Sequence, residues 1–249
     1  MAKLNDTQLE QYAEQGYIIF ENLFTTHEMT ELTAHIDKLD EERETELRLI
    51  GQQGISIPSQ INFTAHLVNQ NEFINRFSME HKFVDITTSI LGPDIKLYWD
   101  QSVYKRPEAN RDFPWHQDTG YALTEPHHYT TCWLALEDAT IENGCIWVMP
   151  GSHHQGLLMH KETDVGKQCY FGEDPGIPVP LKAGSMVAFN SLLFHRSTPN
   201  LSTTTRKGYI LQYSIADSYS PLTGQVFDNG PIIAKDGNPV LQADGQFSV

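Results

Sequence analysis

The sequence predicts a mainly β protein of the α+β class, with a double-stranded β-helix (jelly roll) core buttressed by N-terminal helices. Two features of the chain lead to this prediction. Apolar residues recur at helical spacing in the first 93 residues, whereas short apolar or alternating runs between Gly, Pro and Asn follow. A parallel α/β sheet would need helices that alternate with its strands, and the second part of the chain lacks them.

The first 50 residues contain two helix starts and one strand. Residues 5–8 (Asn-Asp-Thr-Gln) cap a short helix that stops at Gly16. Residues 17–20 are apolar and predict a buried strand. Residues 25–28 (Thr-Thr-His-Glu) form a capping box for a second helix. We expect the charged end of this helix, residues 40–48, to be exposed to solvent.

A third helix is predicted over residues 72–91, before the stop signal Gly92-Pro93. The strands expected after it are residues 95–104, 129–136, 145–149, 185–189 and 209–214. No repeat or linker is visible, so we expect a single domain over residues 1–249. Its expected parts are a helical buttress with a lid segment (1–93), the jelly-roll core (94–220) and a C-terminal extension (221–249).

The composition restricts the classes of partner. The 249 residues include 17 Lys and Arg against 32 Asp and Glu, a net charge of −15. Such a field repels nucleic acid and anionic membrane surfaces. Three cysteines without a CxxC pair, and a polar N-terminus without a leader, indicate a reducing compartment. We therefore expect a soluble cytoplasmic protein, monomeric or homodimeric, that acts on a small molecule.

Three residues have the pattern of an iron-binding facial triad, in which two histidines and one carboxylate bind one side of the metal. A His-x-Asp motif at the end of a strand places its first and third side chains on one face, because strand side chains alternate, and His116-Gln117-Asp118 has this pattern. His195, on a distant strand, supplies the second histidine. The other side of such a metal is open for cosubstrate and oxygen.

Two other pairs of histidine and carboxylate fit a metal site less well. His35 and Asp37 lie inside the second predicted helix, where side chains two residues apart point in nearly opposite directions. His160 and Glu162 have the same spacing but lie in a polar stretch without strand character. We expect neither pair to bind a metal.

Four segments of the chain carry a family resemblance. They are residues 8–19, with a helix and a Gly-Tyr strand, Trp115-His116-Gln117-Asp118, Asn143-Gly144-Cys145 with Met149-Pro150-Gly151-Ser152-His153, and Phe194-His195-Arg196-Ser197 with Arg206. In order and spacing they resemble the phytanoyl-CoA dioxygenase family of iron(II)- and 2-oxoglutarate-dependent oxygenases. The resemblance runs almost end to end, and it implies iron(II), 2-oxoglutarate and O2 as cofactor and cosubstrates.

The resemblance also implies roles for individual residues. His116, Asp118 and His195 would bind the iron. Arg206, eleven residues after the second histidine, would form a bidentate pair with the distal carboxylate of 2-oxoglutarate, helped by the hydroxyl of Ser197. Three further residues would line the cosubstrate pocket: Gln117, Thr131 and Trp133.

Two further features follow from the same resemblance. His153 and His154 belong to a turn after a strand, where we expect them to form hydrogen bonds and not to bind metal. Lys105 resembles a recurrent Lys-Pro element of the family. Here Arg106 stands between this lysine and Pro107, which departs from the family's pattern.

The resemblance implies oxidation of an unactivated C–H bond of a small-molecule metabolite or natural product, with release of succinate and CO2. In the related halogenases a small residue stands at the carboxylate position, so Asp118 predicts hydroxylation or a related oxidation and not halogenation. Desaturation, epoxidation, ring closure and ring expansion stay open, because they depend on where the substrate radical lies. Substrate walls are expected from the lid segment, residues 55–66, and from four side chains: Gln101, Tyr104, Tyr121 and His127.

Two other readings of the residues stay open. A non-catalytic jelly-roll protein would keep the fold and bind only a ligand or partner, and it would not need the complete set of His116, Asp118, His195 and Arg206. A cupin-like metalloenzyme that does not use 2-oxoglutarate would leave Arg206 without a cosubstrate to hold. Binding of 2-oxoglutarate therefore separates these readings.

Overall fold

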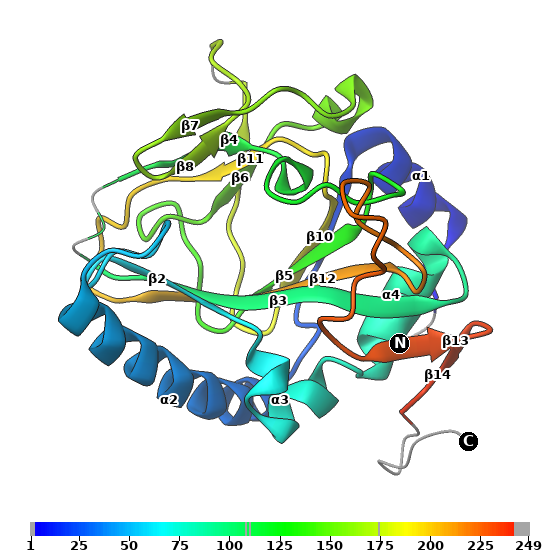
Figure 1. Ribbon diagram of the computed structural model, residues 1–249, viewed down its shortest axis with the longest axis horizontal. Coiled ribbons are helices and arrows are strands. Elements are labelled where there is room, and N and C mark those ends of the chain that lie inside the picture. The colour runs from blue at the N-terminus through cyan, green and yellow to red at the C-terminus, as the bar shows by residue number, and fades with distance from the viewer. Residues whose placement is uncertain (1–2, 108, 110, 174, 242–249) are drawn as a thin grey trace.

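The largest of the three antiparallel β-sheets that the described residues form contains strands from both ends of the chain (Figure 1). The computed structural model describes residues 3–107, 109, 111–173 and 175–241. The strands of the larger sheet are β1 Tyr17–Phe20, β2 Ile61–Ala65, β3 Ile95–Lys105, β5 Thr130–Ala135, β10 Met186–Asn190, β12 Arg206–Ile215, β13 Ile232–Lys235 and β14 Asn238–Pro239. They pair in the order β1-β10-β5-β12-β3-β13-β14, and β2 also pairs with β3. The segments before and after the predicted core thus contribute strands to this sheet.

A smaller sheet packs against the larger one and completes the jelly roll. Its strands are β4 Phe113–His116, β6 Ile146–Val148, β9 Ile177–Val179 and β11 His195–Ser197. They pair in the order β4-β11-β6-β9. A separate hairpin is formed by β7 Lys161–Thr163 and β8 Gly166–Gln168. All five strand runs expected after residue 93 are present, so the mainly β jelly-roll prediction is confirmed.

The helices lie outside the two sheets (Figure 1). They are α1 Asp6–Gln15, α2 Thr26–Ile50, α3 Glu72–Phe77 and α4 His81–Leu91, with short 3-10 turns η1 Leu67–Asn69, η2 Asp118–Gly120 and η3 Ser152–Gln155. The predicted capping boxes of α1 and α2 are both formed. No helix in the described ranges is long and apolar enough to cross a membrane.

The prediction of a single helix over residues 72–91 is wrong. The chain forms two helices there, with a break that starts at Ser78. The carbonyl oxygen of Ser78 accepts a hydrogen bond of 2.7 Å from the hydroxyl of Tyr213 on β12. In a continuous helix this carbonyl would accept from the amide four residues later. A contact with the sheet therefore replaces a helical hydrogen bond.

Apolar side chains fill two layers, one on each face of the larger sheet. On the helix side, Leu32 and Ile36 of α2 pack with Phe83 of α4 and are fully buried. Between the sheets, Trp133 and Phe189 pack in a second apolar cluster. Burying each such side chain contributes roughly 1.5–3 kcal/mol. The layer between the sheets also holds the polar residues described below.

The charged end of α2 is only partly exposed, which corrects the expectation for residues 40–48. Asp40 and Glu44 are 3% and 7% exposed. The guanidinium of Arg106 lies 2.7 Å from Asp40 and 3.7 Å from Glu44. Glu44 accepts a hydrogen bond of 3.0 Å from the amide of Ser59, and Asp40 accepts one of 3.0 Å from Asn62. A distant arginine thus compensates the buried charge and ties α2 to β2.

Replacing Arg106 by Met should lower the free energy of unfolding by about 3–5 kcal/mol, because it leaves the buried carboxylate of Asp40 without its cation. Urea unfolding at equilibrium measures this loss. Arg48→Met is the matched control, since Arg48 pairs with Glu44 through a side chain that is 64% exposed. The control should lose less than about 1 kcal/mol, and equal losses for the two variants would contradict the account.

Asp100 is a second buried carboxylate of the core, on the helix side of β3. It is 1% exposed and accepts hydrogen bonds from the hydroxyl of Tyr209 at 3.0 Å and the amide of Val68 at 3.2 Å. No cation within the described ranges pairs with it. Burial raises the pKa of Asp100 to about 6, although these hydrogen bonds act in the opposite direction.

Because the folded-state pKa of Asp100 lies above its unfolded value, protonation of this carboxyl favours the fold. The stability that the protonated Asp100 carboxyl contributes should be fully present below about pH 4. As the pH rises to about 6, the free energy of unfolding should fall by about 3 kcal/mol. Asp100→Asn should remove this pH dependence, so that the variant is more stable than the wild type at pH 7.

Chemical unfolding across a pH series tests the Asp100 prediction. The exposed Asp164→Asn serves as control and should keep the wild-type profile. If Asp100→Asn also keeps that profile, the carboxyl of Asp100 does not carry the pH dependence.

Candidate active site

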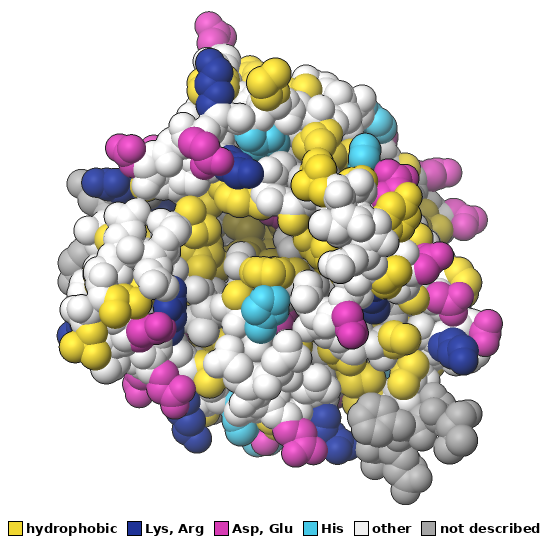
Figure 2. Space-filling model, viewed as in Figure 1, with side chains coloured by type: hydrophobic (Ala, Val, Ile, Leu, Met, Phe, Trp, Pro, Cys, Tyr) yellow, Lys and Arg dark blue, Asp and Glu magenta, His cyan; other side chains and the backbone are white. Residues whose placement is uncertain are grey.

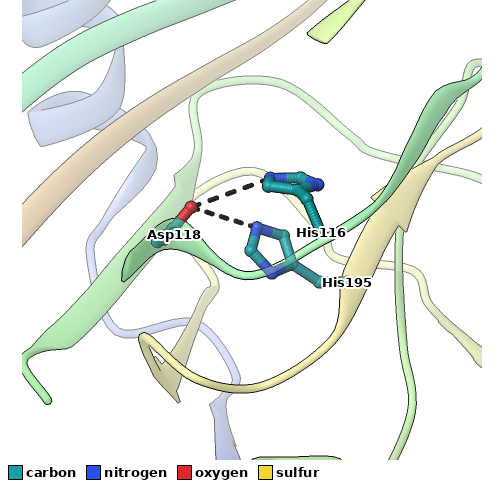
Figure 3. Close-up of side chains that lie close together, drawn as sticks. All are labelled: His116, Asp118 and His195. Atoms are coloured by element: carbon teal, nitrogen blue, oxygen red, sulfur yellow. Dashed lines mark ion pairs between the residues drawn. The ribbon is translucent and has the colours of Figure 1, made fainter. Parts of the chain in front are cut away.

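Antiparallel pairing of β11 with β4 places His195 opposite His116. His116 is the last residue of β4, and Asp118 begins the η2 turn two residues later. Figure 3 shows the three side chains converging on one point. One possible ligand atom from each residue lies within 4.8 Å of the others. The three residues that the sequence predicts as metal ligands are thus brought together.

A backbone carbonyl two residues earlier in the chain orients each histidine. Nδ1 of His116 lies 2.8 Å from the carbonyl oxygen of Pro114, and Nδ1 of His195 lies 3.0 Å from that of Leu193. Because a carbonyl only accepts, each Nδ1 carries the proton and each Nε2 has a free lone pair. Burial and the adjacent His195 lower the pKa of His116 to about 3. A neutral imidazole with a free Nε2 is the form that binds metals.

One carboxylate oxygen of Asp118 faces the two histidines, and the other accepts hydrogen bonds. Its Oδ1 lies 3.3 Å from Nε2 of His195 and 3.7 Å from Nε2 of His116. Its Oδ2 accepts hydrogen bonds from the hydroxyl of Thr131 at 2.6 Å and the amide of Gln212 at 2.9 Å. Burial opposes ionisation, but the histidines and the Thr131 hydroxyl bring the pKa of Asp118 down to about 2. The carboxylate is therefore charged at neutral pH.

Two residues of the larger sheet support this carboxylate. Thr131 lines the cavity, as the sequence predicts, and its hydroxyl also holds Asp118. Gln212, opposite Thr131 in the pairing of β12 with β5, is a residue that the sequence analysis missed. The available signal was a lone amide inside the run Tyr209-Ile210-Leu211-Gln212-Tyr213.

Arg206 begins β12 and faces the same cavity. It is 2% exposed, and its Nε is buried without a hydrogen-bond partner among the residues that the structure describes. Its guanidinium carbon lies 5.2 Å from the ring centre of Trp133. Burial lowers the pKa of Arg206 to about 10, so the group stays charged at neutral pH. A buried cation that faces a cavity favours an anionic ligand.

Ser197 lies in the same cavity wall and has a hydroxyl available to donate. Its oxygen accepts a hydrogen bond of 3.2 Å from Nζ of Lys105, which also donates to the carbonyl of Thr198 at 2.5 Å. Lys105 is 1% exposed and pairs with Arg206 in the register of β3 and β12. Burial, followed by the charge of Arg206, lowers the pKa of Lys105 to about 7. Lys105 thus binds the hydroxyl of Ser197 but does not itself line the cavity.

The expectation that Gln117 lines the cosubstrate pocket is wrong. Its side chain is fully buried and donates to the carbonyls of Gly156 at 2.7 Å and Leu192 at 2.8 Å. Its amide oxygen accepts from the backbone N–H of Leu158 at 2.8 Å. Strand alternation explains the outcome, because the residues on either side point at the metal site. Gln117 instead holds two loops together.

His153, His154 and His160 bond to the backbone, whereas Nδ1 of His35 lies 3.1 Å from the side-chain amide of Asn71. Nε2 of His160 accepts from the amide of Gln117 at 3.1 Å. Nε2 of His153 lies 3.0 Å from the carbonyl of Ala13, and Nε2 of His154 lies 3.3 Å from that of Glu14. Within the described ranges, the triad is the single cluster with the geometry of a metal site.

A cavity of about 440 Å³ adjoins the triad. Figure 2 shows a hollow in this face of the molecule, lined by hydrophobic side chains. Apart from the residues above, its walls are mostly apolar or aromatic: Ile55, Ile61, Phe63, Tyr98, Trp99, Gln101, Val103, Phe113, Tyr121, Ala122, Tyr129, Ile146, Phe189, Arg196 and Ile210. Gln101 and Tyr121 of the expected substrate residues are among them.

Tyr104 and His127 do not line the cavity, which corrects two expectations. The hydroxyl of Tyr104 donates to Asp37 of α2 at 2.6 Å, on the helix side of the larger sheet. The side chain of His127 is 54% exposed and lies 3.5 Å from Glu125. Gln101 and Tyr104 are three residues apart in one strand, so they face opposite sides.

Part of the expected lid, residues 55–66, is a strand of the larger sheet. β2 pairs with β3, and Ile61 and Phe63 contribute to the cavity wall. The preceding turn is attached to α2 through the bond from Ser59 to Glu44. The segment therefore forms a wall that the sheet and α2 hold in place.

Gln212→Leu should weaken iron(II) binding by about 10–100-fold, because the ligand carboxylate of Asp118 loses one of its two hydrogen bonds. Anaerobic titration with iron(II) measures the change. Gln11→Leu, an exposed substitution on α1, is the matched control and should bind iron(II) like the wild type. An unchanged affinity of Gln212→Leu would remove Gln212 from the support of the metal site.

Two comparisons of sequence agree with this geometry. The family model for phytanoyl-CoA dioxygenase (PhyH) matches residues 12–208. The phytanoyl-CoA dioxygenase of Arabidopsis thaliana is 25% identical over 254 residues, which cover 86% of this chain and 90% of that protein.

Solved structures share the fold of this chain. The non-heme monooxygenase ThoJ in its apo form matches with a TM-score of 0.70 and 22% identity, covering 85% of this chain and 78% of that one. The epimerase SnoN in complex with Fe3+, alpha ketoglutarate and nogalamycin RO matches with a TM-score of 0.68 and 19% identity, covering 94% and 98%. With the match over residues 12–208, the chain belongs to the phytanoyl-CoA dioxygenase family, whose members are oxygenases that use iron(II), 2-oxoglutarate and O2.

Proposed function

We propose that this protein hydroxylates an unactivated C–H bond of a small-molecule metabolite or natural product, with release of succinate and CO2. One observation carries the proposal. The triad His116, Asp118 and His195 and the buried cation of Arg206 line a single cavity. The first set suits a divalent iron, and the cation suits the distal carboxylate of 2-oxoglutarate.

The donor atoms fit iron(II). Two neutral imidazole nitrogens and one carboxylate oxygen are the facial-triad set of non-haem iron oxygenases, and they leave positions open on the opposite side. Iron with 2-oxoglutarate and O2 supplies the oxidant for the C–H bond. In this account Asp118 provides the negative charge, and His116 and His195 fix the direction of the open positions.

Arg206 and Ser197 would hold 2-oxoglutarate in the same cavity. A guanidinium offers two parallel N–H donors to a carboxylate, and the Ser197 hydroxyl adds a third donor. A cupin-like metalloenzyme without 2-oxoglutarate would leave the Arg206 charge buried and uncompensated, which is costly. A ligand-binding protein without catalysis would not need the triad. Both alternatives are therefore less well supported than the proposal.

The type of oxidation rests on Asp118. Its carboxylate takes the place that chloride would need in a halogenase, so we favour hydroxylation over halogenation. ThoJ is described as a monooxygenase and SnoN as an epimerase. One fold thus serves more than one outcome, because the outcome depends on where the substrate lies relative to the iron.

We also keep the expectations of a reducing, cytoplasmic setting and of a monomer or homodimer as proposals. Cys132, Cys145 and Cys169 are all buried and free, which suits a reducing compartment. The net charge of −15 supports a small-molecule substrate over nucleic acid.

Arg206→Leu should raise the KM for 2-oxoglutarate by at least about 30-fold, because losing one partner of a buried charged pair costs about 2–5 kcal/mol. Iron(II) affinity should stay within about twofold of the wild type, since Arg206 touches none of the three ligands in the described contacts. Succinate release measures KM, and anaerobic titration measures iron binding. The exposed Arg48→Leu is the matched control. An unchanged KM would rule out Arg206 as the group that holds the cosubstrate.

A further inference from the structure

β3 lines the cavity with two consecutive aromatic side chains because the strand contains a β-bulge. In its pairing with β12, Trp99 is opposite Gln212 and Leu97 is opposite Tyr213, which leaves Tyr98 without a partner. An extra residue of this kind shifts the alternation of side chains along the strand. Leu97 packs in the core on the helix side, whereas Tyr98 and Trp99 both line the cavity.

After the bulge, alternation resumes and brings Gln101 into the cavity wall. Asp100 faces the helix-side core, and Gln101 and Val103 face the cavity. The amide oxygen of Gln101 accepts a hydrogen bond of 3.2 Å from the indole N–H of Trp99. This bond fixes the orientation of the amide, and its NH2 group has no partner in the described part of the chain. Gln101 therefore offers N–H donors to a ligand.

The charged groups of the cavity wall are already engaged. Asp118 belongs to the triad, and it is the one acidic side chain among the described lining residues. Arg206 faces the cosubstrate end. Arg196 lies 3.4 Å from Asp112 and stacks over two tryptophan rings. No lysine lines the described wall. A charged substrate would therefore find no free countercharge.

The polar groups of the wall are also mostly committed. Thr131 and Gln212 hold Asp118, and the Ser197 oxygen is bound by Lys105. The amide of Gln101 remains, and so does the hydroxyl of Tyr98, which has no hydrogen-bond partner among the described residues. The hydroxyl of Tyr121 accepts a bond of 2.8 Å from the backbone N–H of Lys167 and can still donate its own proton.

The aromatic part of the wall reaches the metal ligands. The ring of Tyr121 lies edge-on to the ring of His116, with ring centres 5.5 Å apart, and parallel to that of Phe113 at 6.5 Å. The cavity of about 440 Å³ is near the lower end of ligand pockets, and 2-oxoglutarate would fill part of it. The remaining space suits a compact molecule whose apolar ring carbons contact these walls next to the iron.

We propose that the substrate is an uncharged ring compound, alicyclic or aromatic, that carries a carbonyl or hydroxyl oxygen. Gln101 donates an N–H to this oxygen and so sets which carbon faces the triad. The bulge at Tyr98 makes the arrangement possible, because it turns Trp99 into the cavity where the indole holds the Gln101 amide. The inference rests on the proposed function, since it concerns the substrate of the same site.

Three matched probes test the substrate class: 4-phenylcyclohexanone, the hydrocarbon phenylcyclohexane and the anion 4-phenylcyclohexanecarboxylate. Tryptophan fluorescence follows their binding without O2, in metal-free protein and in protein supplied with iron(II) and excess 2-oxoglutarate. The ketone should bind most tightly in the supplied protein, because it alone combines apolar rings with a neutral acceptor. The carboxylate should bind most weakly there, because burying its charge has no compensation.

Gln101→Leu should weaken binding of the ketone by about 3–10-fold, which corresponds to the free energy of one neutral hydrogen bond. It should change the affinity of the hydrocarbon by less than about twofold. Gln11→Leu on α1 is the control and should leave all three affinities unchanged. This pattern separates the lost donor from a general disturbance of the cavity.

Three results would overturn the proposal: tightest binding of the carboxylate to the supplied protein, equal losses for ketone and hydrocarbon in Gln101→Leu, or no binding of the ketone in either state. Failure of the proposed function would look different. The probes would then bind in the predicted order, but iron(II), 2-oxoglutarate and O2 would give no succinate.

Discussion

The pairing of β11 with β4 decides where the chemistry takes place. It sets His195 opposite His116, although the two histidines are far apart in the sequence. A shift of this register by one residue would turn His195 away from the cavity. The loop after β4 then needs only two residues to bring Asp118 to the same point. The jelly roll supplies this pairing, and the larger sheet adds the hydrogen bonds that hold the carboxylate.

Two charged side chains of the cavity, of opposite sign, suit two different ligands. The negative charge of Asp118 belongs to the triad, and the positive charge of Arg206 lines the same cavity. Arg206 is buried and the side chain of Asp118 is 14% exposed. Each would suit a ligand of opposite sign, iron for the carboxylate and 2-oxoglutarate for the guanidinium. Most of the remaining wall is aromatic or apolar. This supports our proposal that shape and a few hydrogen bonds would recognise the substrate, while the charged groups would serve the cofactor and cosubstrate.

Much of the fold and the triad could be predicted, because caps, strand runs and the His-x-Asp spacing are local patterns. The errors came from contacts between distant segments. Arg106 buries the end of α2, and Tyr213 breaks the helix at Ser78. The site predictions for Gln117 and Tyr104 were wrong because strand alternation turns both side chains away from the cavity. This alternation can be read from the sequence. The bulge at Tyr98 could not be foreseen, because it depends on the pairing of β3 with β12.

Anaerobic titration of the metal-free protein with iron(II) and then 2-oxoglutarate tests the central claim most directly. The claim is that one cavity holds both, the metal on His116, Asp118 and His195 and the cosubstrate on Arg206. The account predicts a weak visible charge-transfer band that appears only after both additions. Iron binding without this band would contradict the cosubstrate site and favour a metalloenzyme of another kind. No binding of either would contradict the enzyme assignment itself.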